Sequence, residues 1–476
     1  MPLRPQKTKI VATIGPACDA PAVLEQMIRA GMSVARLNFS HGTFEEHAAR
    51  IERLRAAARA AGREIALMAD LPGPKMRIGQ LAEEPIQIAP GGTFTLTTRD
   101  IVGDAGRASM TFARLPQVVK PGDRLFLNDG IIQLAVERVD GPDVICRVLT
   151  GGELRSRKGL NLPGIDLGIS AFTERDRECL KFALDHGVDA VSQSFVELAA
   201  DILAVREAAH SFGGEPFVLA KIERAGALEH VEEILAAADG VMVARGDLGV
   251  EVPIERIAIL QKTLVRKAVR LGKPVIVATQ MLESMTHSRQ PTRAEATDVA
   301  NAVLDGTDCV MLSGESATGE FPVEAVATLS RIAAATEPHR ARADLWERLK
   351  TLPREKEYST ADLLSLSVEA VIAASTPAAV VVPTRSGATA RAIARLRLPV
   401  WIAAPTDGAH VVRHLQFSYG IEPVFVPEIS PEWTAFARQW VQAEGLAGSV
   451  ALLVQGPSRA NPHANHRMEI LQLHQP

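Results

Sequence analysis

Aromatic residues and cysteine are scarce in this sequence, and neither sign of charge is in large excess. Phe, Trp and Tyr make up 4% of the 476 residues, and the formal net charge is −4. This near balance gives no indication of nucleic acid or an anionic membrane as the main partner. No apolar run is long enough to span a bilayer, and no signal-peptide core follows the first residues. We therefore expect a cytoplasmic protein with no nucleic-acid or membrane partner.

The four cysteines, Cys18, Cys146, Cys179 and Cys309, are scattered, and none forms a Cys-x-x-Cys pair. Their spacing argues against a disulfide framework or a zinc site and predicts buried thiols in a reducing compartment. Apolar residues make up 47% of the chain and charged residues 23%, which is typical of globular proteins. At roughly 150 residues per domain, the length predicts about three domains.

Short apolar segments, each ending in polar residues, alternate with amphipathic helical stretches. This alternation predicts either a (β/α)₈ barrel or an open doubly wound sheet. Polar residues follow at least six of the segments, which favours the barrel. The expected strands are Lys9–Ile14, Ser33–Leu37, Ile65–Ala69, Ala190–Ser194, Phe217–Ala220, Gly240–Ala244, Pro274–Ala278 and Cys309–Leu312.

Residues 71–157 interrupt this alternation with short alternating runs separated by Pro-Gly, Asn-Asp-Gly and Gly-Pro-Asp. These are hairpin turns, so we expect a small β-barrel domain inserted into a larger barrel formed by residues 1–70 and 158–340. Beyond a charged helical linker, residues 341–476 again alternate strand-like and helical segments. They predict a C-terminal α/β domain with a potential regulatory role.

Candidate functional residues lie at the carboxyl ends of the expected strands, where barrel enzymes carry their active sites. Period-two geometry places Arg36, Asn38 and Ser40 on one face of their strand. Arginine matches a phosphoryl group, and Asn and Ser oxygens suit a hard cation. A polar strand end followed by a turn at His41-Gly42 is the alternative.

Further carboxylates and a lysine follow other strands. Asp70 comes after a buried run, so a nearby cation or a salt bridge to Arg77 should compensate its charge. Lys221 and Glu223 share one side of their strand, where they can bind one phosphate and its metal or simply pair with each other. Glu223 with Asp247 would suit Mg²⁺, which favours one or two carboxylates plus phosphates.

Three more elements line the expected rim. Gly246 permits close backbone approach, so that its N–H and that of Asp247 can hold a carboxylate. Thr279 supplies a hydroxyl at the mouth. Ser313 and Glu315, after the eighth strand, are candidates for a proton relay.

Six segments resemble the signature segments of pyruvate kinases, and the resemblance covers essentially the whole chain. It implies a (β/α)₈ barrel with an inserted β-barrel lid and a C-terminal α/β domain, assembled as a homotetramer. It also implies transfer of the phosphoryl group of phosphoenolpyruvate to ADP in glycolysis, giving pyruvate and ATP, with Mg²⁺. The segments are Ala35–Gly42, Ala220–Glu223, Val241–Val250, Ala278–Ser284, Pro291–Glu295 and Met311–Glu315.

The resemblance also implies roles for individual residues. Arg36 and Lys221 match residues that bind the transferred phosphoryl group, and Lys221 would also stabilise the enolate. Glu223 and Asp247 match Mg²⁺ ligands. The carboxylate-binding set is Gly246, Asp247 and Thr279, with Thr279 and a bound water as the proton donor. The nucleotide contacts are Asn38, Phe39, Ser40, His41, Arg77 and Lys158.

One segment departs from the family pattern. Pyruvate kinases often carry Asp-Thr-Lys-Gly-Pro-Glu-Ile-Arg after the third strand, whereas here it is Asp70-Leu71-Pro72-Gly-Pro-Lys75-Met-Arg77. Family members that need K⁺ bind it at positions matching Asn38, Ser40, Asp70 and the Leu71 carbonyl. The Lys75 ammonium would supply that charge permanently, as in the subgroup that works without K⁺. The alternative is that Lys75 points to solvent and K⁺ still binds.

The third domain contains a loop that resembles the effector loop of sugar-phosphate-regulated relatives. Its amides and hydroxyls could hold an effector phosphate, or they could simply cap the following helix. The loop residues are Thr384, Arg385, Ser386, Gly387, Ala388 and Thr389.

Two other functions use parts of the same set. An Mg²⁺-dependent aldolase or lyase acting on a pyruvate enolate would need Glu223 and Asp247, but not an inserted lid or the phosphate ligands Arg36, Arg77 and Lys158. A non-catalytic phosphometabolite sensor would be favoured by loss of Lys221 or of either acidic ligand, and all three are present.

Overall fold

Eight parallel strands close into a barrel. The computed structural model describes residues 2–340, 359–427, 432–456 and 465–473. Each expected barrel strand is present, and the order β1-β16-β15-β14-β13-β12-β3-β2 is closed, which excludes the open sheet. The strands are β1 (Lys9–Thr13), β2 (Met32–Asn38), β3 (Ala66–Leu71), β12 (Ala190–Gln193), β13 (Phe217–Ile222), β14 (Gly240–Ala244), β15 (Val275–Ala278) and β16 (Cys309–Leu312).

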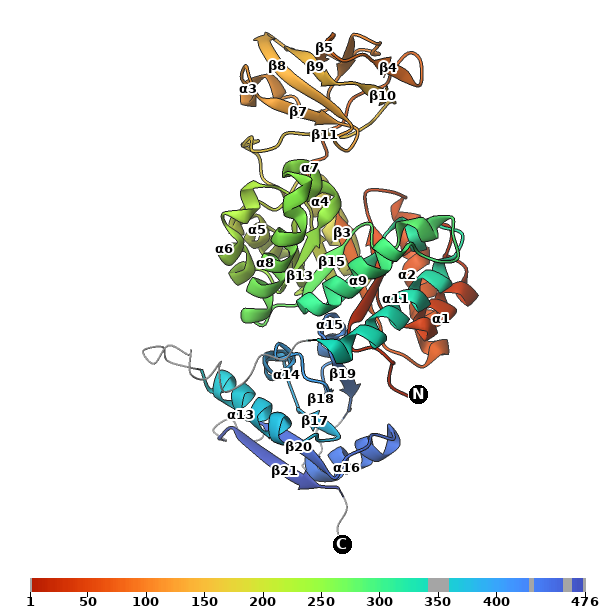
Figure 1. Cartoon of the computed structure of the whole chain (residues 1–476), viewed down its shortest axis with the longest axis vertical. Coiled ribbons are helices and arrows are strands. Elements are labelled where there is room, and N and C mark those ends of the chain that lie inside the picture. Colours follow the sequence, from red (N-terminus) through yellow and green to blue (C-terminus); the bar gives the residue numbers. More distant parts are fainter. Residues whose placement is uncertain (1, 341–358, 428–431, 457–464, 474–476) are drawn as a thin grey trace.

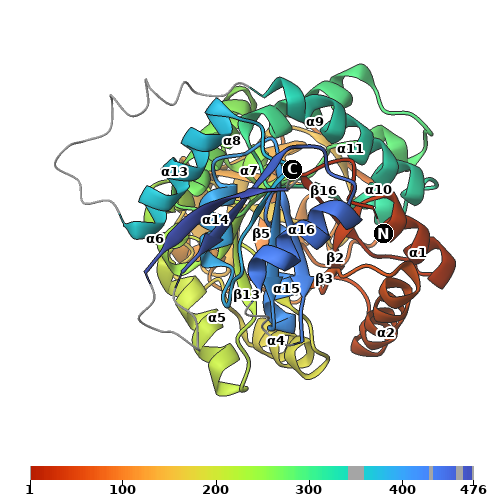
Figure 2. The same ribbon diagram turned by 90° about the horizontal axis from the view of Figure 1, so that it is seen from below.

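Helices surround the barrel (Figure 2). Several begin with a capping box, including one in which Thr173 and Asp176 exchange hydrogen bonds. The helices are α1 (Pro21–Ala30), α2 (Phe44–Ala61), α4 (Glu174–Asp185), α5 (Ala199–Ser211), α6 (Val231–Ala237), α7 (Arg245–Glu251), α8 (Ile257–Arg270), α9 (Arg293–Asp305), α10 (Gly314–Ala317) and α11 (Pro322–Thr336).

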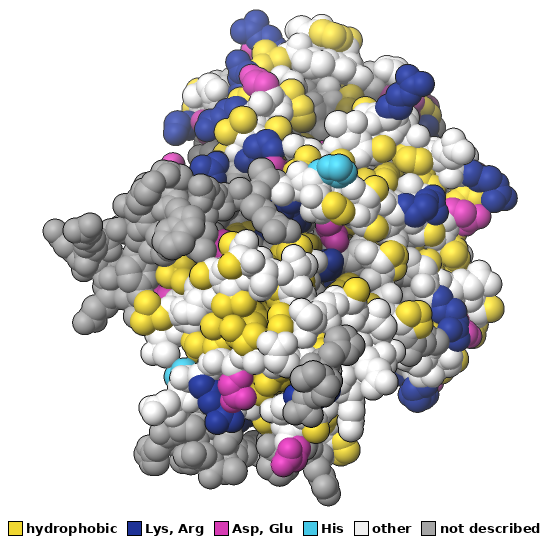
Figure 3. All heavy atoms as spheres, turned by 60° about the horizontal axis from the view of Figure 1, so that its bottom comes forward, with side chains coloured by type: hydrophobic (Ala, Val, Ile, Leu, Met, Phe, Trp, Pro, Cys, Tyr) yellow, Lys and Arg dark blue, Asp and Glu magenta, His cyan; other side chains and the backbone are white. Residues whose placement is uncertain are grey.

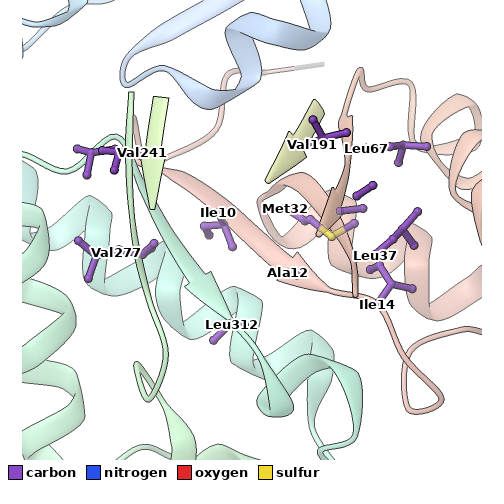
Figure 4. Close-up of a cluster of buried hydrophobic side chains, with 14 of the residues drawn as sticks. Ile10, Ala12, Ile14, Met32, Leu37, Leu67, Val191, Val241, Val277 and Leu312 are labelled. Atoms are coloured by element: carbon purple, nitrogen blue, oxygen red, sulfur yellow. The ribbon is translucent and has the colours of Figure 1, made fainter. Parts of the chain in front are cut away.

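The strands are apolar on both faces because both faces are covered. One layer lies between strands and helices and includes Ile10, Val241 and Val277, all fully buried or nearly so (Figure 4). A second cluster fills the barrel interior and includes Met68 and Met242. Side chains packed on both sides fix the strand ends, and with them the rim of the barrel.

The insert lies above the carboxyl end of the barrel (Figure 1). Its strands form a six-stranded sheet, β11-β7-β8-β9-β5-β6, and a two-stranded sheet, β10-β4, around a core of their own. The bounds are β4 (Ile86–Ile88), β5 (Thr93–Thr97), β6 (Arg107–Ser109), α3 (Leu115–Val118), β7 (Arg124–Leu127), β8 (Ile132–Asp140), β9 (Asp143–Thr150), β10 (Gly152–Leu154) and β11 (Leu160–Asn161).

The C-terminal domain lies across the amino end of the barrel (Figures 1 and 2). Its sheet has the order β19-β18-β17-β20-β21, in which only β21 is antiparallel. Its elements are α13 (Thr360–Ala374), β17 (Ala379–Val381), α14 (Ala388–Ala394), β18 (Trp401–Thr406), α15 (Ala409–His414), the 3₁₀ turn η5 (Leu415–Phe417), β19 (Ile421–Phe425), α16 (Trp433–Ala443), β20 (Val450–Gln455) and β21 (Arg467–Gln472). The helical linker expected beyond Arg340 falls in 341–358, outside the described residues.

Within the described ranges, no helix combines the length and the hydrophobicity needed to cross a bilayer. On the face seen in Figure 3, basic and acidic side chains are spread among hydrophobic and uncharged ones.

Candidate active site

Two basic and two acidic side chains meet inside the mouth of the barrel, at the ends of β2, β3 and β13. Arg36 Nε donates to Asp70 Oδ2 at 2.6 Å. Lys221 Nζ lies 3.2 Å from Asp70 Oδ1 and 2.8 Å from Glu223 Oε1. The two-residue spacing of Lys221 and Glu223 therefore does place both on one side of the strand.

All four side chains are almost completely buried. Burial alone would raise the pKa of Asp70, but Lys221 and Arg36 outweigh it and lower this pKa to about 2. Burial would likewise lower the pKa of Lys221, but Asp70 and Glu223 raise it to about 12. Asp70 is therefore ionised and Lys221 protonated across the neutral range.

Two hydroxyls that were not anticipated from the sequence complete this network. Ser194 Oγ accepts a hydrogen bond from Lys221 Nζ at 2.7 Å and donates to Asp70 at 3.4 Å. Thr13 Oγ1 accepts from Arg36 Nη1 at 2.9 Å. The available signal was position alone, since Thr13 ends β1 and Ser194 follows β12 at the same rim.

Asp247 lies close enough to Glu223 for the two carboxylates to interact. Burial, followed by repulsion from Glu223, raises the pKa of Asp247 to about 7. Among the described residues, no group of three or more His, Cys, Asp and Glu side chains is arranged to hold a metal ion. The pair of Glu223 and Asp247 instead fits Mg²⁺ that takes its other ligands from substrate and water. The donor set of this site therefore matches the expected metal.

Thr279 and Gly246 lie side by side at the mouth. The N–H of Gly246 donates to Thr279 Oγ1 at 2.8 Å, and this hydroxyl donates to the Ala278 carbonyl at 2.6 Å. The structure thus brings together the groups expected to bind a carboxylate, and they are hydrogen-bonded to one another.

The expected nucleotide contacts fall into two groups. In the turn after β2, the N–H of Ser40 donates to Asn38 Oδ1 at 3.1 Å. The Phe39 ring is 5% exposed and packs on Phe182 and other rings, so only its backbone can contact a ligand. Burial lowers the pKa of His41, and the positive charges of Lys75, Arg77 and Arg36 lower it further. His41 therefore lies near the rim.

The second group lies where the chain passes between barrel and insert. Arg77 and Lys158 are on adjacent segments there, since the N–H of Ile78 donates to the Lys158 carbonyl at 3.0 Å. Arg77 Nη1 donates to the Arg157 carbonyl at 3.3 Å. The alternative in which a salt bridge to Arg77 compensates Asp70 is therefore wrong, because Asp70 pairs with the side-chain cations of Arg36 and Lys221.

Lys75 is half-buried on the site side of this segment. Burial, then Arg77 and Lys221, lower its pKa to about 8, while Asp70 and Asp247 partly offset this decrease. The Lys75 ammonium therefore shares an electrostatic environment with the residues matching the monovalent-cation site, including Asp70 and its neighbour Leu71.

Two further features were expected from the sequence, one after β16 and one in the C-terminal domain. Glu315 accepts from the N–H groups of Ser313 and Leu282, at 2.7 and 3.1 Å, so it joins two loops. The Thr384–Thr389 segment leads into α14 of the C-terminal domain, at the opposite end of the barrel (Figure 1). There Thr384 Oγ1 accepts from the N–H of Gly387, the residue before the helix, at 2.9 Å. An effector phosphate at this loop stays a prediction.

Comparisons with known proteins agree with this geometry. The family model described as "Pyruvate kinase, barrel domain" matches residues 5–326, and "Pyruvate kinase, alpha/beta domain" matches residues 363–466. The chain belongs to the pyruvate kinase family. Pyruvate kinases generally use Mg²⁺, and Glu223 and Asp247 supply a fitting pair of ligands for it.

Individual pyruvate kinases resemble the chain over nearly their whole length. The enzyme of Thermococcus litoralis is 47% identical, with 90% of each chain covered. That of Mycobacterium intracellulare is 43% identical, covering 89% of this chain and 88% of its own. The crystal structure of a pyruvate kinase from Cryptosporidium parvum superimposes with a TM-score of 0.91 at 34% identity, covering 98% and 96% of the two chains.

Proposed function

We infer that this chain is a pyruvate kinase that transfers the phosphoryl group of phosphoenolpyruvate to ADP, giving pyruvate and ATP. The observation that carries this conclusion is the buried network of Arg36, Asp70, Lys221 and Glu223 at the carboxyl end of the closed barrel. Phosphoryl transfer needs mainly positioning and charge neutralisation, and a preorganised pair of cations provides both.

Arg36 and Lys221 are the groups that would bind the transferred phosphoryl. Asp70 holds both cations in place, so little reorganisation is required when the substrate enters. The raised pKa of Lys221, about 12, keeps it protonated, which lets it stabilise the enolate oxygen after transfer. Mg²⁺ held by Glu223 and Asp247 would neutralise charge on the phosphoryl and enolate oxygens.

The substrate carboxylate would bind at Gly246, Asp247 and Thr279. The hydrogen bond between the Gly246 N–H and the Thr279 hydroxyl supports this placement, because a carboxylate could replace it. Protonation of enolpyruvate would then come from Thr279 with a bound water. The nucleotide would lie against Asn38–His41, Arg77 and Lys158, under the insert.

Pyruvate release from phosphoenolpyruvate and ADP with Mg²⁺ tests this function directly, beside a Lys221→Ala control. Activity that the control loses is the expected result. An aldolase or lyase would form no ATP, and a sensor would bind phosphoenolpyruvate without turnover. Either outcome would contradict the proposal.

We also propose that activity does not require K⁺. Asp70 already has two cationic partners, and the Lys75 ammonium lies in the same environment. The pKa of Lys75, about 8, leaves it mostly protonated at pH 7, and this charge would replace the monovalent ion expected at Asn38, Ser40, Asp70 and the Leu71 carbonyl.

The test compares activity in K⁺-free buffer with and without KCl, using tetramethylammonium chloride as the control for ionic strength. We expect little change for the natural chain. Lys75→Glu should lower K⁺-free activity about tenfold by removing the charge, and KCl should restore it. Strong KCl activation of the natural chain would refute K⁺ independence.

We propose a homotetramer in the cytoplasm. Ile254 and Ile259 are 74% and 63% exposed beside α7, and β21, at one edge of its sheet, exposes 54% of Ile470. Exposed apolar side chains and open sheet edges are typical of surfaces that pair with a second copy. Light scattering after gel filtration should give four copies, and a monomer would contradict the assembly.

All four cysteines are buried free thiols, which suits a reducing compartment such as the cytoplasm.

A further inference from the structure

The segment after β15 adopts a backbone conformation that its residues disfavour. Thr279 and Gln280 have φ angles of 70° and 52°. These values lie in the left-handed region, which is a genuine outlier for a β-branched residue such as threonine. Such strain costs on the order of 1–3 kcal/mol and persists only where surrounding contacts hold it.

Arg245 supplies these contacts. It is the first residue of α7, and its strand β14 lies next to β15 in the barrel. Arg245 Nε donates to the Ala278 carbonyl at 3.2 Å, and Nη2 donates to the Thr279 carbonyl at 2.6 Å. The guanidinium therefore holds the peptide groups on both sides of the strained Thr279 residue.

Arg245 is itself held from the opposite side. Its Nη1 lies 2.7 Å from Asp298 Oδ2 of α9 and donates to Gln261 Oε1 of α8 at 3.2 Å. The side chain is 11% exposed. Because these donors are committed to protein acceptors, Arg245 is arranged to fix a backbone and not to bind substrate.

The immobilised residue carries the hydroxyl that lines the barrel mouth. Gly246 directly follows Arg245, and its N–H donates to Thr279 Oγ1 at 2.8 Å. The ends of β14 and β15 are therefore joined twice, through the Arg245 guanidinium and through the Gly246 amide. If the Thr279 backbone relaxed to a negative φ, its side chain would leave this position.

We propose that Arg245, oriented by Asp298, is a positioning residue that keeps Thr279 in the left-handed conformation and its hydroxyl in place for protonating the enolate. The inference rests on the proposed pyruvate kinase activity, in which Thr279 serves this step. A planar arginine can span two carbonyls and a carboxylate at once, whereas a lysine is a single point charge on a flexible stem.

Arg245→Lys tests the proposal because it keeps the charge and removes the planar fork. The measurements are kcat, KM for phosphoenolpyruvate, and exchange of the pyruvate methyl protons with deuterium oxide, followed by NMR with Mg²⁺ and ATP present. We expect kcat and the exchange rate to fall about 100-fold, the effect of an approximately 1 Å misplacement. KM should rise by less than about tenfold and less than kcat falls, because Arg36 and Lys221 keep the phosphoryl contacts and Thr279 is only one part of the carboxylate site. Asp298→Asn should lower kcat and the exchange rate in the same way but by a smaller factor.

A second substitution distinguishes positioning from a direct role. Asparagine adopts the left-handed region more readily than glutamine. Adding Gln280→Asn to Arg245→Lys should therefore recover part of the lost kcat, although it restores no contact made by Arg245.

The chain offers a matched control at the other end of β14. Arg206 Nε donates to the Ala237 carbonyl at 2.9 Å, and Arg206 Nη2 lies 2.9 Å from Asp239 Oδ2. Arg206→Lys should leave kcat unchanged. An equal loss in this control, unchanged kcat in Arg245→Lys, or no recovery with Gln280→Asn would each overturn the positioning role. An inactive natural chain would instead refute the pyruvate kinase activity itself.

Discussion

The two ends of the barrel use the same Arg–Asp chemistry for different purposes. At the carboxyl end, the carboxylate of Asp70 accepts from the side chains of Arg36, Ser194 and Lys221. At the amino end, Asp308 accepts from the backbone N–H groups of Val275 and Tyr419, at 3.1 and 2.9 Å. Side-chain partners can move to a ligand, whereas backbone partners cannot do so without unfolding.

The amino end repeats this arrangement at alternate strands. Asp189 accepts from the Leu67 N–H at 2.8 Å and Asp239 from the Val218 N–H at 2.8 Å. Arg413 of the C-terminal domain pairs with Asp189, and Arg397 pairs with Asp308 at 2.5 Å. These pairs join the barrel to the C-terminal domain, so the charged side chains at the amino end hold the two domains together.

An aromatic side chain completes the closed end. Phe417 of η5 belongs to the cluster that fills the barrel interior and stacks on Phe217, with ring centroids 5.2 Å apart. The amino end is therefore sealed by the C-terminal domain, while the carboxyl end holds the polar network. The comparison predicts that substitutions at the carboxyl end mainly lower activity and substitutions at the amino end mainly lower stability.

Lys221→Met should have the largest effect, and it should fall on activity. Removing a preorganised cation from the reacting centre costs about 1,000-fold in kcat, or about 4 kcal/mol. We expect far-UV circular dichroism to be unchanged, since Arg36 still pairs with Asp70. Activity within about tenfold of the natural chain would contradict the role of Lys221.

Phe417→Ala should have the next largest effect, and it should fall on stability. Truncating a buried phenylalanine costs about 3 kcal/mol through lost burial and the cavity left behind. Calorimetry should show a lower Tm while kcat changes little. Phe425→Ala, at a ring 50% exposed in the same domain, is the matched control and should leave Tm nearly unchanged.

The smallest effect concerns a buried lysine at the amino end. Lys9 Nζ donates to the Ile421 carbonyl at 2.6 Å, and burial lowers the pKa of Lys9 to about 8. In the unfolded chain the pKa of Lys9 is about 10.4. Between about pH 8 and pH 10.4 the Lys9 side chain is therefore protonated in the unfolded state and mostly neutral in the folded state. Stability should therefore rise with pH through this window.

Denaturant titrations at several pH values can measure this dependence. From pH 7 to 9 the contribution of Lys9 should be about 1 kcal/mol. Lys9→Met should flatten the rise in the free energy of unfolding with pH. An unchanged slope in that variant would show that Lys9 does not titrate in this range.

Local sequence pattern determined most of the architecture. Mainly apolar runs of four to six residues with polar ends marked all eight barrel strands, because strands covered on both faces are largely apolar. The hairpin turns marked the insert. In the C-terminal domain the apolar runs Ala378–Val382, Val400–Ala403 and Val450–Val454 predict β17, β18 and β20. They do not predict β19 and β21, which lie at sheet edges, where polar residues and proline such as Glu422 and Pro423 of β19 are tolerated.

Side-chain chemistry and family resemblance indicated which residues belong to the rim, but not how they pair. Spacing along one strand correctly placed Lys221 beside Glu223. The predicted barrel already implies that β2 lies next to β3. Spacing could not show that Asp70 pairs with Arg36 of β2 and with Lys221 of β13, two strands away, instead of with Arg77. It likewise could not show that the Phe39 ring packs against Phe182 in the core.

The tertiary structure alone decided the contacts between residues far apart in the chain. Phe417 enters the barrel from another domain, Ser194 bridges Lys221 and Asp70, and Arg245 holds the strained Thr279. The spacing of apolar residues in the sequence shows which faces of each helix or strand are buried, because each segment's own residues determine which of its faces is apolar. It carries no information on which distant side chains share one space, since that depends on how the whole barrel closes.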